Sequence, residues 1–250
     1  YYEQLGSNMT LTEIVADIVS IYKSHIGLPV HTADALSNFE NIKSKVVFKL
    51  IKAETNMELL GDIPHVRFLD MAIVFYLLLD TSEIGQMTAL IHNNHLRVWN
   101  ITEEEVYRLA KINTPRLLPA RIKSMKEVML EMLAAQFEEI VEPDILGELL
   151  EDMPDKSPLY VFTNQQGVNG AGCILYEDCL AEFAQNHNSD IIILPSSVHE
   201  VLLAADRGDM VYEDLEEMVK HINREEVPEE DVLSNRIYRY SLSEKMIIVV

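Results

Sequence analysis

The richest set of chemically active side chains in this sequence lies in the segment Leu194–Glu200, which reads LPSSVHE. The segment ends an aliphatic run and holds two hydroxyls, one imidazole and one carboxylate within five residues. A nucleophile, a general base and an orienting acid are the groups that a serine hydrolase or transferase requires. The candidate catalytic residues are Ser196, Ser197, His199 and Glu200.

The same segment also has a structural interpretation. A serine nucleophile usually sits on a strained turn from strand to helix with the pattern G-x-S-x-G, which is absent here. In extended chain, Ser197 and His199 share one face and Ser196 points to the other. A corner between two strands, in which the serines bind local backbone and His199 pairs locally, therefore fits the segment as well. The sequence favours this interpretation and leaves the catalytic one open.

His92 and His95 have the i, i+3 spacing that places two imidazoles on one face of a helix. A metal site needs at least a third ligand, for which Asp70 or Glu103 is the candidate, and no H-E-x-x-H motif or cysteine lies nearby. The sequence favours a helix entry with half-exposed histidines. It therefore predicts no metal and no other cofactor.

Three further polar residues are candidates for a binding surface: Asn113, Arg116 and Asn164. The first two belong to the run Asn113-Thr-Pro-Arg116, which is equally suited to fixing the exit of a helix. Asn164 precedes a loop whose glycines run G-x-x-G-x-G from Gly167. A phosphate loop opens a helix, whereas apolar residues that predict a strand follow here, so we interpret this loop as a hairpin turn.

Charge excludes two classes of partner. The 250 residues include 41 acidic and 20 basic side chains, a net charge of -21. Residues 1–125 hold 14 acidic and 12 basic residues, and the remainder hold 27 and 8. Nucleic acid and anionic membranes attract basic proteins, so neither is predicted as a partner. The acids of the second half are interpreted first as a solvated surface, and a basic protein partner is the second interpretation. The small basic group of Lys43, Lys45, Lys49 and Lys52 receives no assignment.

The apolar runs and the two cysteines bear on location. The longest apolar run, Met71–Leu79, is about half as long as a membrane span requires. Cys173 and Cys179 form neither a disulfide framework nor a metal motif, which is typical of a reducing cytoplasm. No signal peptide is visible in the sequence, and the absence of an initiator Met predicts that the first lobe lacks its start.

Periodicity and capping residues predict the elements that position these groups. Helices are expected over Leu11–Ile26, Asn93–Trp99, Thr102–Ile112, Met125–Glu139, Asp178–Asn186 and Tyr212–Ile222, and a short helical or turn segment over Glu54–Leu60. Strands are expected over Lys45–Lys52, Val66–Leu79, Gln86–Ile91, Leu159–Thr163, Ala171–Tyr176, Asp190–Leu194, Glu200–Ala205, Arg236–Tyr240 and Met246–Val250. The expected caps are Thr102 with Glu105, Ser124 and Asp209, and Pro115 and Pro119 are expected to impose extended backbone.

The order of these elements shows no strict βαβ alternation. The predicted class is therefore α+β, with mixed, largely antiparallel sheets, packing helices and two contiguous lobes. Residues 1–140 form the predicted N-terminal lobe, 141–157 an acidic connector containing Pro143, Gly147 and Pro154, and 158–250 the acidic C-terminal lobe.

Five segments, in this order and spacing, resemble an uncharacterised family of bacterial proteins that is common in gut anaerobes and classed as a domain of unknown function. They are ENIKSKVVFKLI, LLGDIPHVRFLDMAIVFYLLL, IHNNHLRVWNITEEEVYRLAKINTPRLLP, LYVFTNQQGVNGAGCILY and DIIILPSSVHEVLL. The resemblance covers Tyr1–Tyr240, with signatures at Asn113–Pro119, Thr163 with Asn164, and Leu194–Val201. It supports the predicted boundaries and implies no activity, cofactor or partner.

Two functions remain open at this point. The first is a non-catalytic binding or regulatory module, and the second is a hydrolase or transferase that uses Ser196 or Ser197 with His199 and Glu200. The sequence favours the first, because the polar clusters do not include a complete catalytic set.

Overall fold

The structure is a computed structural model, which describes residues 38–82, 85–137 and 159–250. The expected helix over Leu11–Ile26 and the expected connector 141–157 lie outside these ranges. The chain divides into two compact units, 1–42 and 43–250. The described part of the first unit includes helix α3 (Phe39–Ile42), and the second unit contains both sheets described below.

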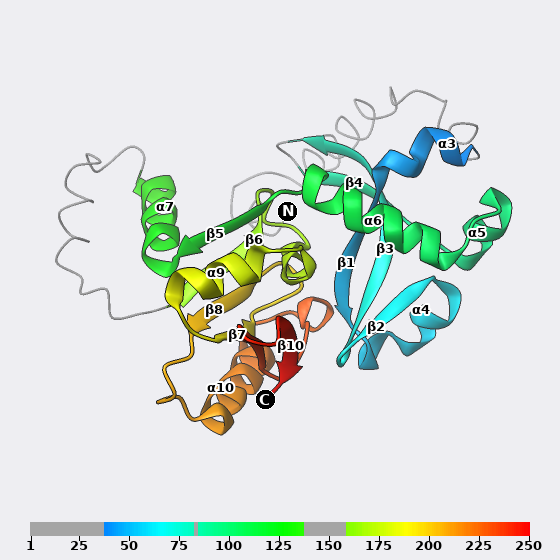
Figure 1. Cartoon of the computed structure of the whole chain (residues 1–250). Helices are drawn as coiled ribbons and strands as arrows, with labels where there is room; N and C mark the ends of the chain where they lie inside the picture. The colour runs from blue at the N-terminus through cyan, green and yellow to red at the C-terminus, as the bar shows by residue number, and fades with distance from the viewer. Residues whose placement is uncertain (1–37, 83–84, 138–158) are drawn as a thin grey trace. The chain divides into compact units, whose positions relative to one another are not determined.

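The first sheet has four antiparallel strands (Figure 1). They are β1 (Val46–Lys52), β2 (His65–Phe68), β3 (Met71–Ser82) and β4 (Gly85–Leu90). β3 lies at the centre and pairs with each of the other three strands. The prediction of one strand over Val66–Leu79 was wrong, because Leu69 adopts a left-handed conformation with φ 55° and the chain reverses into a hairpin.

Helices cover the two faces of this sheet. Neighbouring residues of a strand point to opposite faces, so the side chains of Val74 and Phe75 in β3 lie on opposite faces of the sheet. Phe75 packs against Tyr107 of α6 (Glu103–Leu117), with ring centroids 6.0 Å apart. Val74 belongs to a hydrophobic cluster with Leu60 of α4 (Met57–Asp62), a helix that follows the short 3-10 helix η3 (Glu54–Asn56). α6 and α4 therefore lie on opposite faces of the sheet.

α6 begins as predicted and ends later. Thr102 Oγ1 accepts a hydrogen bond from Glu105 N–H, and the Glu105 side chain accepts one from Thr102 N–H, which confirms the capping box. The helix continues through Pro115 to Leu117, so the prediction of extended backbone at Pro115 was wrong. A proline removes one helical hydrogen bond, and the side chains flanking it compensate by binding the neighbouring strand, as described below.

The second sheet has six antiparallel strands in the order β10-β9-β7-β8-β6-β5. They are β5 (Ala120–Ser124), β6 (Leu159–Asn164), β7 (Ile191–Pro195), β8 (Val201–Ala205), β9 (Tyr238–Ser241) and β10 (Met246–Val249). The α+β class with antiparallel sheets is thus confirmed. β5 precedes the expected connector in sequence and nevertheless pairs with β6.

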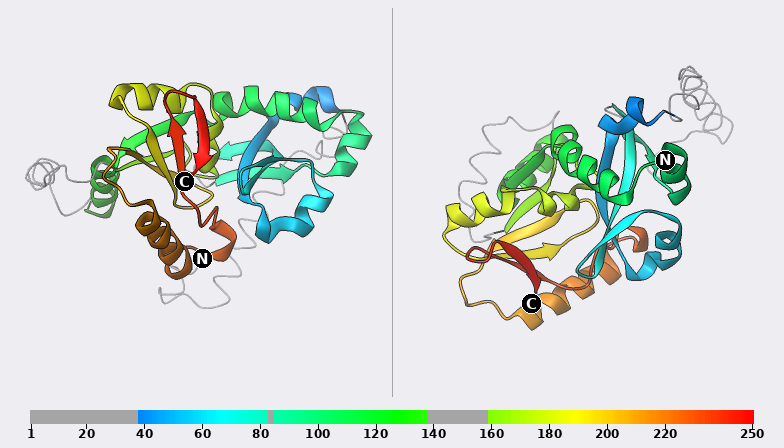
Figure 2. Two further views of the ribbon diagram at one scale, coloured as in Figure 1. Left: turned by 60° about the horizontal axis from the view of Figure 1, so that its bottom comes forward. Right: turned by 45° about the vertical axis from the view of Figure 1, so that its right-hand side comes forward.

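Two helices cover opposite faces of this sheet (Figure 2). Tyr160 of β6 packs edge-on against Phe183 of α9 (Cys179–His187). The preceding residue, Leu159, packs instead in the hydrophobic cluster that includes Val219 of α10 (Tyr212–Glu225). The N-cap of α10 is Val211, so the prediction that Asp209 caps this helix was wrong. At the other edge, Ser124 caps α7 (Met125–Phe137) through hydrogen bonds with Glu127, as predicted.

The glycine-rich segment is a buried 3-10 helix, η4 (Gly170–Leu175), and the prediction of a hairpin with a strand over Ala171–Tyr176 was wrong. β6 pairs with β5 and β8 and leaves no edge for such a strand. A Cβ on Gly170 would lie 2.0 Å from Thr163 Oγ1, and one on Gly172 would lie 3.2 Å from a ring carbon of Phe48. The two glycines let η4 pack closely against β6 and β1, which belong to different sheets.

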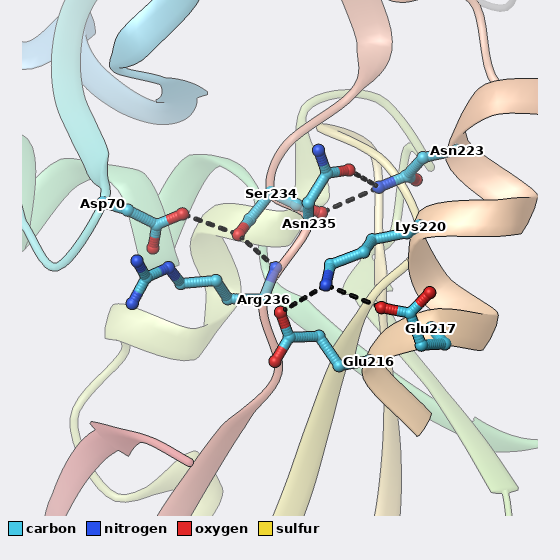
Figure 3. A network of polar contacts seen from close by, with 8 residues as sticks. All are labelled: Asp70, Glu216, Glu217, Lys220, Asn223, Ser234, Asn235 and Arg236. Carbon is cyan, nitrogen blue, oxygen red and sulfur yellow. Dashed lines mark hydrogen bonds and ion pairs between the residues drawn. The ribbon is translucent and has the colours of Figure 1, made fainter. Parts of the chain in front are cut away.

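A polar network also joins the two sheets (Figure 3). Ser234 Oγ donates to Asp70 Oδ2 over 2.7 Å, and Arg236 N–H donates to Ser234 Oγ. From α10, the Asn223 side chain donates to Ser234 O and to Asn235 Oδ1. The segment that leads into β9 is therefore held both by the β2–β3 turn and by α10. No helix in the described part of the chain is long and apolar enough to cross a membrane.

Candidate functional site

The Leu194–Glu200 segment forms the corner between β7 and β8, and His199 is bonded on both ring nitrogens there. Its Nδ1 accepts a hydrogen bond from Asn169 N–H over 3.1 Å. Its Nε2 lies 3.3 Å from Asp231 Oδ1. The imidazole therefore links the loop before η4 to η5 (Glu229–Asp231).

The two serines of the corner bind close neighbours. Ser197 Oγ accepts a hydrogen bond from His199 N–H over 3.1 Å, and Ser196 Oγ lies 3.5 Å from Glu200 Oε1. Among the described residues, no hydrogen bond joins either serine hydroxyl to the imidazole of His199. The four candidate catalytic residues thus lie together, and their bonds do not form a nucleophile and base pair.

Asn164 lies at the end of β6 and is 1% exposed. Its side-chain amide donates to Val168 O over 2.8 Å, and its side-chain oxygen accepts from Gln166 N–H over 2.9 Å. The preceding Thr163 donates its hydroxyl to His199 O over 2.7 Å. These side chains shape the turn that leads to Asn169 and hold it against the corner.

Asn113 and Arg116, near the end of α6, bind the backbone at the start of β1. The Asn113 side chain donates to Lys43 O and Val46 O, and Arg116 donates to Ser44 O. Thr114 lies between them and accepts a hydrogen bond from Phe48 N–H over 3.0 Å. Among the strands that the structure describes, β1 pairs with β3 alone, so these polar side chains bind backbone groups of its other edge.

His92 and His95 stand at the start of α5 (Asn93–Trp99). His92 Nδ1 lies 2.7 Å from Asp62 Oδ2, and His95 Nδ1 accepts from His92 N–H over 2.9 Å. The His95 ring stacks on Trp99. Asp70 is bonded elsewhere, and Glu103 accepts a hydrogen bond from His65 N–H. In the ranges that the structure describes, no group of three or more potential ligands could hold a metal ion.

A cavity of about 240 Å³ opens beside the corner, on the face of the first sheet that α4 partly covers. Its lining comes from strands β1, β3 and β4, from η3 and α4, from the loop before η4 and from η5. They are Lys49, Ile51, Asn56, Leu59, Val74, Tyr76, Thr88, Leu90, Asn169 and Glu230. Asn169 connects the cavity to the corner, because its backbone N–H donates a hydrogen bond to His199.

Two lining residues carry polar groups that have no hydrogen-bond or ion-pair partner among the described residues. Tyr76 is 3% exposed, and its hydroxyl has no hydrogen-bond partner among the described residues. Lys49 Nζ lies 5.9 Å from the centre of the Tyr76 ring and makes no ion pair within 4 Å in the described ranges. Burial lowers the pKa of Lys49, an effect that the charge of Asp231 partly opposes. Burial is also the main cause that raises the pKa of Tyr76, so its hydroxyl stays protonated and able to donate.

Comparison with protein families gives one match. The profile of the family of unknown function DUF5688 matches residues 1–242, nearly the whole chain. The chain belongs to the DUF5688 family. No curated protein and no solved structure gives a significant match.

Sequence reasoning about this DUF5688 chain missed the cavity. Lys49 was part of an unassigned basic group, and Tyr76 stood inside an apolar run. A signal was present in the strand, because Lys49 shares the period of two with Val47 and Ile51 and therefore lies on an apolar face. A lysine on such an apolar face is uncommon and indicates a candidate site.

A larger hollow of about 530 Å³ in the DUF5688 chain lies between the end of α6 and the segment after η4. Its lining includes Lys111, Glu177 and Cys179. Lys111 already pairs with Glu177 over 2.9 Å, and burial is the main cause that raises the pKa of Cys179, so its thiol stays protonated. The smaller cavity is the better candidate because its lining includes the Tyr76 hydroxyl, which has no partner among the described residues.

Proposed function

We propose that this chain is a non-catalytic module that binds a small molecule in the cavity lined by Lys49 and Tyr76. The observation that carries the proposal is the Tyr76 hydroxyl, which is buried without a partner among the described residues. A buried polar group that makes no hydrogen bond costs about 1–3 kcal/mol. A ligand that accepts a hydrogen bond from this hydroxyl recovers that free energy.

The geometry of the corner supports binding over catalysis. Both nitrogens of His199 have partners, so the imidazole is not placed to take a proton from Ser196 or Ser197. Its bonds instead position Asn169, which lines the cavity. In this proposal the Leu194–Glu200 segment supports the binding site.

The setting that we propose is the bacterial cytoplasm, with a basic protein as partner of the acidic C-terminal part. Exposed acids on α10 support this proposal, among them Glu213, Asp214 and Glu217. Contacts through such a surface weaken as salt rises. A pull-down with the purified chain at low and moderate salt tests it, and recovery that does not depend on salt contradicts it.

Thermal unfolding in the presence of a panel of neutral, cationic and anionic metabolites tests the small-molecule proposal. Compounds no larger than an amino acid suit the cavity, which is smaller than the pockets of about 300–1,000 Å³ that hold drug-sized ligands. We expect some compounds to raise the Tm of the natural chain and to have less effect on Tyr76→Phe.

The matched control is Tyr107→Phe, which alters a tyrosine of α6 that packs on the opposite face of the same sheet. Its response to the panel should equal that of the natural chain. A panel in which no compound acts, or in which Tyr76→Phe responds as the natural chain does, contradicts the proposal.

A further inference from the structure

We infer that the ligand of this cavity is a small monocarboxylate with an aliphatic body, whose carboxylate contacts Lys49 Nζ and the Tyr76 hydroxyl. This inference rests on the proposed function and names the chemical class of the ligand. Its evidence is the position of the charges in the cavity and the nature of its walls.

Lys49 gives the sign of the ligand's charge. It projects from β1 on the same face as Tyr76, since Val47 pairs with Tyr76 and Lys49 pairs with Val74. Lys49 is half-buried, and an ammonium that has lost part of its hydration favours an anion beside it. Among the described residues no carboxylate forms an ion pair with Lys49, and Asp231, whose charge raises the pKa of Lys49, pairs with His199. A bound carboxylate supplies the missing counter-charge.

Tyr76 gives the second contact. Its hydroxyl has one proton to donate and no acceptor among the described residues. A carboxylate has two oxygens and accepts hydrogen bonds from a lysine and a hydroxyl together. Hydrogen bonds to a charged group are about twice as strong as those between neutral groups, so an anion uses these two donors better than a neutral ligand does.

The remaining walls define the rest of the ligand. Four lining side chains are aliphatic: Ile51, Leu59, Val74 and Leu90. They favour an aliphatic body, because a polar one would lose its hydration without gaining partners. Glu230 also lines the cavity and Asp231 lies next to it in sequence. Two acidic residues beside the site disfavour a dianion such as a phosphate monoester.

Isothermal titration with a matched series tests the inference. The probes are 4-methylpentanoate, its amide, the corresponding alcohol and inorganic phosphate. We expect 4-methylpentanoate to bind at least about tenfold more tightly than its amide, because only the anion pairs with the ammonium. Lys49→Met should weaken the binding of 4-methylpentanoate by at least about tenfold and Tyr76→Phe by about threefold to tenfold.

Lys52→Met is the control, since it removes a lysine of the same strand that does not line the cavity. It should leave the affinity unchanged, and urea unfolding of all three variants verifies that they are folded. If the amide or the alcohol binds as tightly as the carboxylate, or phosphate binds more tightly, the inference is wrong and the proposed binding function stands. If no probe and no compound of the wider panel binds, both are wrong.

Discussion

The hydroxyl of Tyr238 donates a hydrogen bond of 2.6 Å to Oδ1 of Asp70, which lies 168 residues earlier in the chain. Tyr238 begins β9 of the second sheet, and Asp70 stands in the turn between β2 and β3 of the first. Ser234, which precedes β9, donates to the other oxygen of the same carboxylate. Asp70 of the first sheet therefore binds β9 and the segment before it through two hydrogen bonds.

We expect Asp70→Asn to lower the free energy of unfolding by about 2 kcal/mol, since an amide accepts from only one of the two hydroxyls. Tyr238→Phe removes one of these hydrogen bonds. In a double-mutant cycle measured by urea unfolding, the two substitutions should couple by about 1 kcal/mol. The control is Asp80→Asn, at an exposed position of β3. Additive effects of Asp70→Asn and Tyr238→Phe would contradict the role of this contact.

We expect Gly170→Ala to destabilise the chain by about 3 kcal/mol or more, because its Cβ would overlap Thr163 Oγ1 and approach His199 O to 2.6 Å. Gly61→Ala is a matched control in α4, where a Cβ meets nothing within 4 Å. It should stabilise the chain by about 0.5–1 kcal/mol, as alanine does in a helix. Thermal unfolding distinguishes the two, and equal Tm values for both variants would refute the packing of η4.

We expect Thr114→Val to lower the free energy of unfolding by about 1–3 kcal/mol. Its hydroxyl accepts from Phe48 N–H and donates to Ala110 O over 2.6 Å, so valine leaves a buried backbone N–H without an acceptor. Thr114→Ser keeps the hydroxyl and should recover most of the loss. Urea unfolding measures both, and a serine variant as unstable as the valine variant would show that shape, not hydrogen bonding, matters here.

The lowered pKa of Lys49 predicts a pH-dependent stability. Between the folded pKa and the ordinary value near 10.5, the unfolded chain binds a proton that the folded chain has released, so this group makes stability rise with pH. At pH 7 the charged Lys49 is unfavourable, and we expect Lys49→Met to be more stable than the natural chain. That advantage should shrink as pH approaches about 10.

Urea unfolding of both chains from pH 7 to pH 10 measures this difference, with Lys52→Met as the control for losing a lysine charge on β1. If Lys49→Met is more stable than the natural chain by the same amount over this whole range, the lowered pKa of Lys49 is contradicted. The same reasoning predicts that a bound carboxylate is released as pH rises, because it requires the ammonium form of Lys49.

His199→Ala should lower the free energy of unfolding by about 1–2 kcal/mol, because Asn169 N–H loses its acceptor. It should also weaken the binding of any ligand that raises the Tm of the natural chain. His199→Asn places an acceptor oxygen close to the position of Nδ1 and should recover part of both effects. Ser196→Ala should leave ligand binding unchanged. A loss of binding in Ser196→Ala equal to that in His199→Ala would favour a chemical role for the serine.

Local signals predicted much of the fold. The capping boxes at Thr102 and Ser124 depend on residues three apart, and the aliphatic strand β7 needs no distant partner to be recognised. The errors occurred where distant contacts decide the backbone. The turn at Leu69 contains neither glycine nor proline, and its following residue is fixed by hydrogen bonds from Ser234 and Tyr238.

The candidate site was predicted only in part for the same reason. The corner residues are contiguous, so composition was enough to single them out. The cavity is lined by strands β1, β3 and β4 together with the loop before η4 and the 3-10 helix η5. These segments are far apart in the sequence, so no local pattern connects them. The missing partner of the Tyr76 hydroxyl is a property of the packed structure, so no sequence pattern could have revealed it.

The side chains that bind the outer edge of β1 have a consequence for association between molecules. An open strand edge offers backbone donors and acceptors to any extended segment that approaches it. Asn113 and Thr114 occupy the outward groups of Val46 and Phe48, so an incoming strand finds them already bonded. The Asn113–Arg116 run at the end of α6 therefore protects this edge from strand addition and from aggregation of the chain with itself.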